Sequence, residues 1–196
     1  MLGVTGTYCS GKNTLVSFLK ESGFSEIDVD RVGHQILDDG GVGAQLRRRF
    51  GAGIFTPQGS IDRRVLGQRV FRDPGELRAL ESIVHPPMVR EVEHVLKRIE
   101  GRAVINAAVM FRMGLERLCD VVVCVRAPLI RRLKRARRRD GVTLFQMLRR
   151  MRAQRGICPK FNANGVDIYY VDNDQGLDHL HTQILKILTE KGQTNH

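Results

Sequence analysis

The sequence predicts an α/β fold in which a mostly parallel sheet lies between helices. Apolar runs of strand character, Leu2–Thr5, Arg102–Ala107 and Val121–Val125, alternate with segments of helical spacing. The run Val121–Val125 is apolar on both faces, which is typical of a buried parallel strand. A glycine-rich turn directly follows the first run, at the strand end where open α/β sheets place their chemistry. Such alternation favours a parallel sheet with right-handed crossovers.

The glycine-rich turn, Gly6–Lys12, has the sequence Gly-Thr-Tyr-Cys-Ser-Gly-Lys and leads into a helical segment, Asn13–Lys20. Strand, Gly-x-x-x-x-Gly-Lys and helix in that order are typical of the phosphate-binding P-loop. Gly6 and Gly11 allow φ values that other residues avoid, so successive N–H groups can point at phosphate oxygens. The helix N-terminus adds positive potential, and the Lys12 ammonium reaches the β- and γ-phosphates.

This turn predicts a nucleotide-phosphate site in which Lys12 is also catalytic. The P-loop pattern has Ser or Thr after the lysine, whose hydroxyl holds Mg²⁺, and this chain has Asn13 instead. An amide oxygen can ligate Mg²⁺ or a shared water, although Asn is longer and its geometry differs. We therefore expect ATP and Mg²⁺ as cofactors and Asn13 as the candidate metal residue. The expected nucleotide-binding residues are Gly6, Cys9, Ser10, Gly11, Lys12, Asn13 and Thr14.

Length and composition fit one domain with a core of its own. The chain has 196 residues, of which 42% are hydrophobic and 27% charged, and no apolar run approaches a membrane span. The N-terminus is a predicted strand rather than a signal peptide, so we expect a cytoplasmic protein without a membrane partner. The cysteines lack metal or disulfide spacing, and reduced thiols are expected. They are Cys9, Cys119, Cys124 and Cys158.

The net charge of +11 is concentrated in one stretch. Between Arg131 and Arg155 there are eleven Arg or Lys and one acid, Asp140, a net of +10. Such a stretch is either a nucleic-acid patch or an arginine-rich flap that closes over phosphates. The P-loop favours the flap. Aromatic residues make up 6% of the chain and only Phe145 lies among these arginines, so no base-stacking platform and no nucleic-acid partner are expected.

A second strand, Phe24–Asp30, ends in acidic residues. Asp28 and Asp30 alternate along an extended chain and would face opposite ways unless the strand ends between them. One of the two would turn toward Mg²⁺ or a substrate hydroxyl, while the other caps the helix Arg31–Leu37. Because it follows a P-loop strand and helix, Asp30 is the candidate catalytic and substrate-binding carboxylate.

Residues 31–100 are predicted to form a helical substrate-binding insert. Gly40 and Gly41 break the chain, and His85, Pro86 and Pro87 interrupt a helical pattern. His85 is either a helix-boundary histidine or a substrate contact. The predicted helices are Val42–Phe50, one from about Asp62, Asp73–Ile83 and Met88–Ile99.

The remainder returns to the α/β pattern, and the whole chain is predicted to be a single P-loop kinase domain. The nucleotide core takes about 1–30, 101–128 and 166–196, and the arginine-rich lid takes about 129–165. The predicted lid helices are one from Leu129, broken at Asp140, and Leu144–Arg155 with Thr143 as its cap. The last strand is Ile168–Val171. The terminal helix, Leu177–Leu188, has one apolar face made by Leu177, Leu180, Ile184, Ile187 and Leu188.

The chain resembles the dephospho-CoA kinase family nearly from end to end. The resemblance implies ATP-dependent, in-line phosphorylation of the ribose 3′-hydroxyl of dephospho-CoA, the last step of CoA biosynthesis. It also implies a catalytic carboxylate at Asp30, a lid arginine over the phosphates at Arg139, and substrate contacts at Arg63, His85 and Pro86. The matching residues are the P-loop, Ile27–Asp30, Phe50–Gly51, Gly59–Arg63, Val70–Phe71, Ile83–Pro86, Phe111, Gly114–Leu115 and Arg139–Gly141 ahead of Gln154.

Two departures from the family keep alternatives open. Besides Asn13, the chain has Ala108–Arg112 where the family usually has Pro-Leu-Leu-Phe-Glu, so a carboxylate has become a cation or that side chain has moved out to solvent. The alternatives are a slow or non-catalytic nucleotide- or CoA-binding homologue, and a P-loop kinase for another small hydroxyl acceptor.

Overall fold

The computed structural model describes residues 1–140, 158 and 165–192, and only the backbone of 139 and 140. The chain forms two compact units, one of Met1–Ile27 with Ile99–His196 and one of Asp28–Arg98. The first unit contains the sheet, and the second is built mainly of helices. The bounds of the second unit differ by a few residues from those expected for the helical insert.

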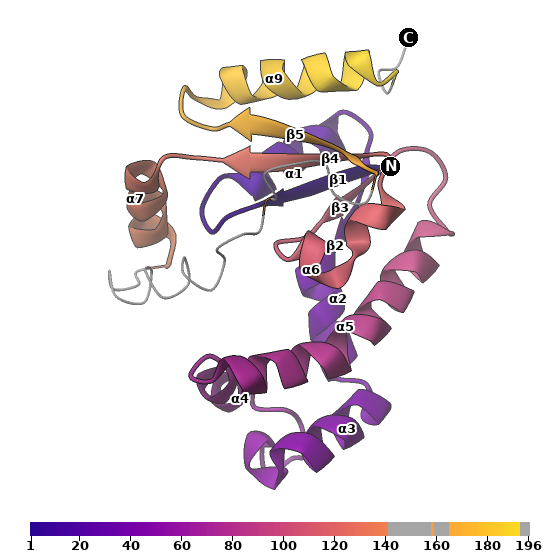
Figure 1. Cartoon of the computed structure of the whole chain (residues 1–196), viewed down its shortest axis with the longest axis vertical. Helices are drawn as coiled ribbons and strands as arrows, with labels where there is room; N and C mark the ends of the chain where they lie inside the picture. The colour runs from indigo at the N-terminus through magenta and orange to yellow at the C-terminus, as the bar shows by residue number, and fades with distance from the viewer. Residues whose placement is uncertain (141–157, 159–164, 193–196) are drawn as a thin grey trace. The chain divides into compact units, whose positions relative to one another are not determined.

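The first unit is built on a five-stranded sheet with the order β2-β3-β1-β4-β5 (Figure 1). Strand β1 pairs in parallel with β3 and β4, and β4 pairs in parallel with β5, so the predicted parallel α/β sheet is confirmed. In the central strand, Val4 lies opposite Asn106 on one side and Val123 on the other. The strands are β1 Leu2–Gly6, β2 Ser25–Asp28, β3 Ala103–Asn106, β4 Val121–Arg126 and β5 Asp167–Asp172.

Helices α1 (Lys12–Glu21) and α9 (Leu177–Glu190) cover one face of this sheet and share its main core. The rings of Phe18 and His181 stack with centroids 3.9 Å apart, which joins the two helices at the rim of that core. Leu177 was expected on the buried face of the terminal helix but is 53% exposed, because it is the first residue of α9. The core residues of α9 are Leu180, Ile184, Ile187 and Leu188.

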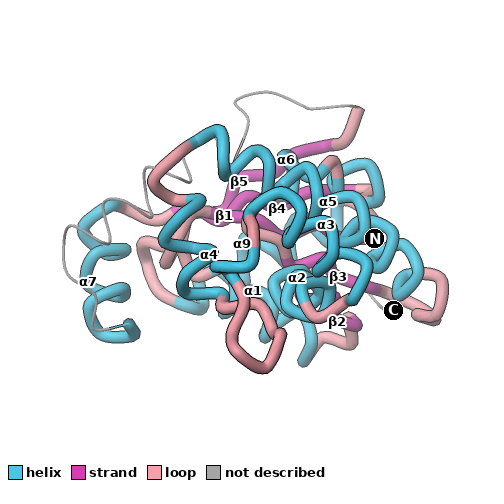
Figure 2. Tube along the Cα trace, turned by 90° about the horizontal axis from the view of Figure 1, so that it is seen from below, coloured by secondary structure: helices cyan, strands magenta, loops and turns pink. Residues whose placement is uncertain are grey.

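The opposite face of the sheet lies against α6 (Met110–Met113) and the 3₁₀ turn η2 (Leu115–Leu118). Gly3 of β1 is the point of closest approach, because an added Cβ would lie 2.8 Å from Met110 Sδ and 2.9 Å from Cys119 Sγ. Helix α7 (Leu129–Asp140) lies beyond the carboxyl ends of β1 and β4 in both views (Figures 1 and 2). The end of the strands that carries the P-loop is therefore next to a strongly basic helix.

In the second unit, every α-helix begins at an aspartate cap. Asp28, Asp39, Asp62 and Asp73 each accept backbone N–H groups of the first turn that follows, which satisfies donors without a partner in the helix. The elements are α2 Val29–Leu37, α3 Gly40–Phe50, the 3₁₀ turn η1 Ala52–Ile54, α4 Arg63–Val70 and α5 Pro74–Leu96.

Two predicted boundaries are wrong because of these caps. The strand expected to reach residue 30 ends at Asp28, whose carboxylate accepts from the N–H groups of Asp30 and Arg31 at 3.0 and 3.3 Å. Gly40 and Gly41 do not break the chain but form the first turn of α3, since Asp39 accepts from Val42 N at 2.9 Å. A favourable cap thus outweighs the low helix propensity of glycine.

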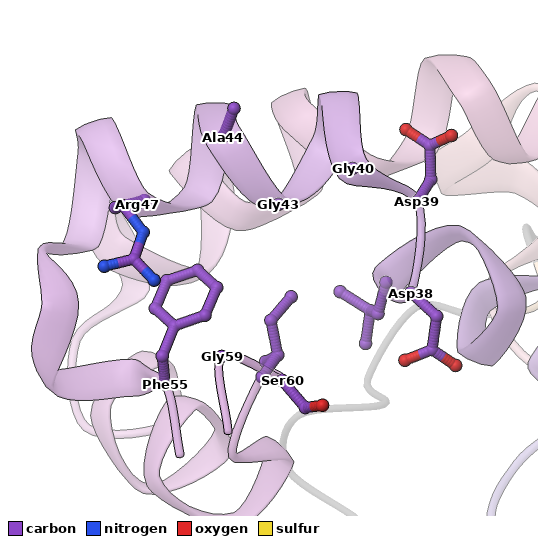
Figure 3. Close-up of a pocket in the computed structure, with 11 residues that line it drawn as sticks. Asp38, Asp39, Gly40, Gly43, Ala44, Arg47, Phe55, Gly59 and Ser60 are labelled. Atoms are coloured by element: carbon purple, nitrogen blue, oxygen red, sulfur yellow. The ribbon is translucent and has the colours of Figure 1, made fainter. Parts of the chain in front are cut away.

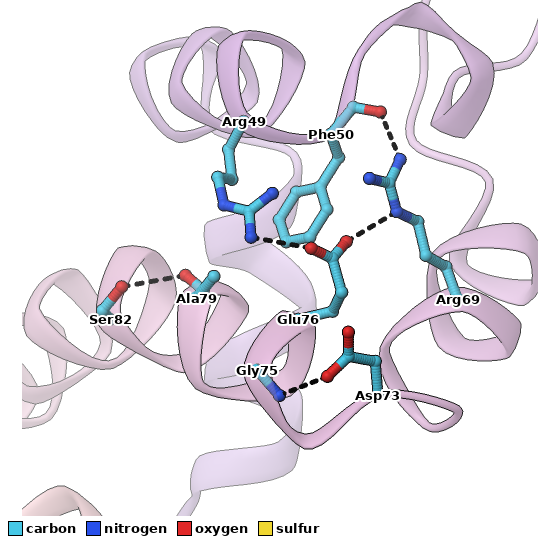
Figure 4. A network of polar contacts seen from close by, with 8 residues as sticks. All are labelled: Arg49, Phe50, Arg69, Asp73, Gly75, Glu76, Ala79 and Ser82. Atoms are coloured by element: carbon cyan, nitrogen blue, oxygen red, sulfur yellow. Dashed lines mark hydrogen bonds and ion pairs between the residues drawn. The ribbon is translucent and has the colours of Figure 1, made fainter.

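Three helices of this unit are joined by the carboxylate of Glu76 on α5 (Figure 4). Glu76 accepts from Arg49 on α3 and from Arg69 on α4, at 2.7 Å in each case. Arg69 also donates to the carbonyl of Phe50 at 2.7 Å, and both guanidinium groups lie over the Phe50 ring. Hydrogen bonds from the two arginines lower the pKa of Glu76, so it remains an anion at neutral pH.

Helix α5 continues through the segment where an interruption was expected. Pro86 and Pro87 lie inside one helix of 23 residues, and the ribbon of α5 changes direction near its middle (Figure 1). Proline removes a helical hydrogen bond and crowds the preceding turn, which bends a helix rather than ending it when packing holds both halves. Val84, Met88 and Val92 supply that packing, because all three are buried in the helical unit.

The predicted helix Leu144–Arg155 and its cap Thr143 lie outside the described residues, as does most of the stretch assigned to the lid beyond Asp140. Within the described part of the chain, no helix combines the length and the apolar character needed to cross a membrane.

Candidate active site

The P-loop connects β1 to α1, as predicted, and its two glycines have different roles. Gly11 has φ 101°, in the left-handed region, immediately before α1 begins at Lys12. Gly6 was also expected to need an unusual φ, but its φ is not in that region. Gly6 is needed for space instead, because an added Cβ would lie 2.6 Å from Val125 O and 2.6 Å from Ser10 Oγ.

Between the glycines the loop turns tightly. Cys9 has φ 59°, a conformation that costs a side-chain-bearing residue of the order of 1–2 kcal/mol. Ser10 N donates to Thr7 O at 3.0 Å and closes a turn. Ser10 is 1% exposed, and its Oγ has no hydrogen-bond partner within the described residues. Cys9 is half-buried and, like Cys119, Cys124 and Cys158, is a free thiol.

The start of α1 presents the groups that a phosphate needs. Lys12 is half-buried, Asn13 and Thr14 are exposed, and α1, which is described throughout, has no acidic residue in its first turn. The positive end of the helix is therefore not neutralised by the helix itself. The exposed amide of Asn13 is an oxygen donor of the kind Mg²⁺ accepts, so the residue present fits the ion.

Two arginines of helix α7 contact backbone carbonyls of the P-loop, and one of them also contacts Asn173, the residue after β5. Arg132 donates to Tyr8 O at 2.9 Å, and Arg135 donates to Ser10 O at 3.0 Å and to Asn173 Oδ1 at 2.9 Å. Burial lowers the pKa of the Arg132 guanidinium. The sequence predicted an arginine-rich lid but not that these two arginines contact backbone carbonyls. The side chain of Arg139 lies outside the described part, and its role over the phosphates stays a prediction.

Glu26 on β2 is a charged residue near the P-loop that the sequence analysis did not identify. Its carboxylate accepts from Asn106 Nδ2 at 2.8 Å and from Lys20 Nζ at 3.0 Å. Burial raises the pKa of Glu26, but these hydrogen bonds and the charges of Lys20 and Lys12 outweigh it and leave the pKa lowered. Glu26 is therefore an anion within electrostatic range of the P-loop lysine.

The remaining predicted site residues lie in the helical unit. Asp28 is the helix cap, which leaves Asp30 exposed in the first turn of α2 with its side chain outside the cap. Arg63 donates to His34 O at 3.1 Å and to both carboxylate oxygens of Asp38 at 3.1 and 3.2 Å. Two further predicted residues, His85 and Pro86, lie in the middle of α5 and not at a helix end.

A hollow of about 470 Å³ lies in the same unit between the start of α3 and the turn before α4 (Figure 3). The Arg47 guanidinium stacks over the Phe55 ring at 4.1 Å and forms one wall. Asp38, which forms an ion pair with Arg63, lies on the side opposite Arg47 and Phe55 in Figure 3. The hollow combines an aromatic–guanidinium wall with acidic groups. Its other lining residues include Leu37, Asp39, Gly43, Ser60 and Ile61.

Arg112 occupies the position where a carboxylate was expected from the family pattern. It lies on the short helix α6, and its side chain is exposed. Of the two possibilities that the sequence left open, exposure agrees with a side chain directed to solvent.

Comparison with known proteins agrees with the fold. A family model described as dephospho-CoA kinase matches residues 1–178. A dephospho-CoA kinase of Carboxydothermus hydrogenoformans is 33% identical over 193 residues, which cover 96% of this chain and 92% of the relative. A Thermus thermophilus crystal structure superposes with a TM-score of 0.81 at 29% identity, covering 97% of this chain and 96% of the other. The dephospho-CoA kinase of Campylobacter jejuni has the same fold, with a TM-score of 0.66 at 24% identity and 98% of each chain covered.

Proposed function

Because this chain belongs to the dephospho-CoA kinase family and phosphorylates dephospho-CoA to give CoA, we propose that it transfers the γ-phosphoryl group of ATP in line to the ribose 3′-hydroxyl. The observation that carries this proposal is the P-loop, which ends at Lys12, the first residue of α1, in a first turn that has no acidic residue. Backbone N–H groups, a helix end and one ammonium together stabilise the charge that develops on a transferred phosphoryl group. We also propose a cytoplasmic location.

Mg²⁺ is the second part of the proposal. The Asn13 amide oxygen would hold it, together with phosphate oxygens of ATP and water. When bound, the ion would neutralise phosphate charge and orient the transferred group. Lys12, Ser10 and Gly11 bind and orient the phosphates from the protein side, and Cys9 of the loop and Thr14 in the first turn of α1 complete the proposed site.

For the acceptor we propose Asp30 as the general base that takes the proton of the attacking hydroxyl. Asp28 is already occupied as the cap of α2, whereas the Asp30 carboxylate is exposed and outside that cap. Arg63, His85 and Pro86 are the proposed substrate-binding residues. The hollow bordered by Asp38 is the proposed site for a non-reacting part of the acceptor, because its lining residue Asp38 forms an ion pair with Arg63. Arg139 is proposed to contact the phosphates.

The test is steady-state ADP release from MgATP with and without dephospho-CoA, with CoA identified as the product. Acceptor-dependent ADP release supports the kinase and shows that Asn13 is tolerated. Binding of ATP or dephospho-CoA without turnover would instead support a homologue without catalysis. Turnover with another small alcohol but not with dephospho-CoA would indicate a different acceptor.

Asp30→Asn tests the proposed base, and Asp28→Asn is its matched control. Both changes remove one carboxylate within the same three residues, but Asn at position 28 keeps the helix cap, since Asn is as good a cap as Asp. We expect kcat of Asp30→Asn to fall about 10²–10⁴-fold with little change in ATP affinity, and the control to keep most of its activity. A rise in KM alone for Asp30→Asn would assign Asp30 to binding.

A further inference from the structure

We propose that Arg132 and Arg135 of α7, together with Asn173, are positioning residues. They hold the P-loop in its phosphate-binding conformation by hydrogen bonds to its backbone carbonyls. This inference rests on the proposed function, because it assigns a task within the same site. Among the arginines of α7 whose side chains the structure describes, Arg131 and Arg138 are exposed, whereas Arg132 and Arg135 contact the P-loop.

The contacts reach successive carbonyls of the loop. Arg132 Nε donates to Tyr8 O at 2.9 Å, and Arg135 Nη1 donates to Ser10 O at 3.0 Å and lies 3.5 Å from Cys9 O. Arg132 and Arg135 are three residues apart, so they lie on one face of α7. Arg131 and Arg138 on the same helix are exposed.

Asn173 completes the support from the end of β5. Its Nδ2 donates to Ser10 O at 2.9 Å, while its Oδ1 and its carbonyl accept from Arg135 Nη2 at 2.9 and 3.3 Å. Asn173 is 2% exposed, and its own N–H donates to Arg126 O at 2.8 Å, which ties it to β4. The support is therefore anchored in the sheet and not only in α7.

The orientation of the loop's N–H groups follows from these contacts. In a planar trans peptide the C=O and the next N–H point in opposite directions. Donors held against Tyr8 O and Ser10 O therefore turn the N–H groups of Cys9 and Gly11 away from α7. The donors to Tyr8 O and Ser10 O lie on either side of Cys9. They supply the external constraint that the positive φ of Cys9 needs.

Arginine is required by the geometry and not only by charge. One guanidinium of Arg135 bridges Ser10 O and Asn173 with two different nitrogens, a fork that a lysine ammonium cannot reproduce. Asn173 also leaves no room for a side chain at position 11, because a Cβ added to Gly11 would lie 1.9 Å from Asn173 Nδ2. The loop and its support are thus mutually fitted.

The experiment compares Arg135→Lys and Arg132→Lys with the control Arg131→Ala. Hydrogen–deuterium exchange of the peptide covering the P-loop is measured without nucleotide, and KM for ATP and kcat are measured with dephospho-CoA. We expect loop amides of each Lys variant to exchange about ten-fold faster and kcat/KM for ATP to fall about 10–100-fold, with a melting temperature near that of the control.

The Lys variants separate positioning from direct attraction of phosphate, since they keep the positive charge. Loop exchange and KM equal to those of the wild-type protein would overturn the proposal and assign both arginines a purely electrostatic role. Should a Lys variant unfold, Asn173→Ala removes one donor to Ser10 O while leaving both arginines, and unchanged loop exchange in that variant also contradicts the proposal. Absence of turnover in the wild-type protein would refute the proposed function, while loop exchange would still decide this inference.

Discussion

Replacing Gly6 by alanine tests whether the first P-loop glycine is there for space. The added Cβ would lie 2.6 Å from Val125 O, a backbone atom of the central sheet, and 2.6 Å from Ser10 Oγ. Ordinary contacts begin near 3.4 Å. Because β4 is paired with β1 on one side and with β5 on the other, Val125 O is held in place. We therefore expect the P-loop to move instead.

The expected size of the effect follows from two opposing contributions. Overpacking a tight site costs about 1–3 kcal/mol. Replacing glycine by alanine also lowers the conformational entropy of the unfolded chain. This stabilises the folded state by about 0.4–1 kcal/mol, because the φ of Gly6 is one that alanine adopts. A net loss of about 1–2 kcal/mol lowers the melting temperature by about 2–8 °C in a chain of this length. A loop shifted by nearly 1 Å lowers turnover by about 10²-fold.

The assay is thermal unfolding together with acceptor-dependent ADP release, and Gly53→Ala is the matched control. A Cβ at position 53 meets nothing within 4 Å, so this variant reports the effect of the methyl group alone. Gly6→Ala with normal turnover, or with the same melting temperature as Gly53→Ala, would refute the steric argument.

Two further predictions concern charged groups of the P-loop side. Lys12→Ala is expected to abolish turnover with an unchanged melting temperature, because the half-buried lysine lies at a loop end and not in the core; normal turnover would exclude Lys12 from phosphate binding. Glu26→Gln is expected to lose about 1 kcal/mol of stability at pH 7. Because the pKa of Glu26 is lowered on folding, its contribution is complete above the unfolded value near 4.5 and disappears as pH falls through the lower folded value. Urea unfolding of both proteins at pH 7 and pH 3 checks this, and a difference that does not shrink at pH 3 would contradict it.

Local patterns were sufficient to predict the sheet and the P-loop. The unbroken apolar run Val121–Val125 became the interior strand β4, and Gly-x-x-x-x-Gly-Lys became the turn before α1. The errors lie where packing or a cap competes with propensity. Pro86 and Pro87 remain inside α5 because buried residues hold both halves, and Gly40 remains helical because Asp39 caps it.

The missed parts of the site depend on which segments become neighbours. Glu26 matters because β2 lies beside β3, which brings it to Asn106, 80 residues away in the sequence. Arg135 belongs to the site because α7 lies against the P-loop, which brings Arg135 to Ser10, 125 residues earlier in the sequence. An arginine-rich stretch predicts positive charge, but it does not say which guanidinium groups contact carbonyls.

The aspartate caps give the two units different folding behaviour. In the helical unit each helix start is encoded within three residues of its own cap, as at Asp62 and Asp73, so its first turns can form before distant segments meet. The sheet has no such local start, since Leu2 pairs with Val104 and Val121 only after most of the chain has been brought together. Loop-closure entropy makes such pairing slow. During synthesis the N-terminal strand obtains its partners only when the segments around Val104 and Val121 have been made, whereas each helix of the second unit follows its own cap directly in the sequence.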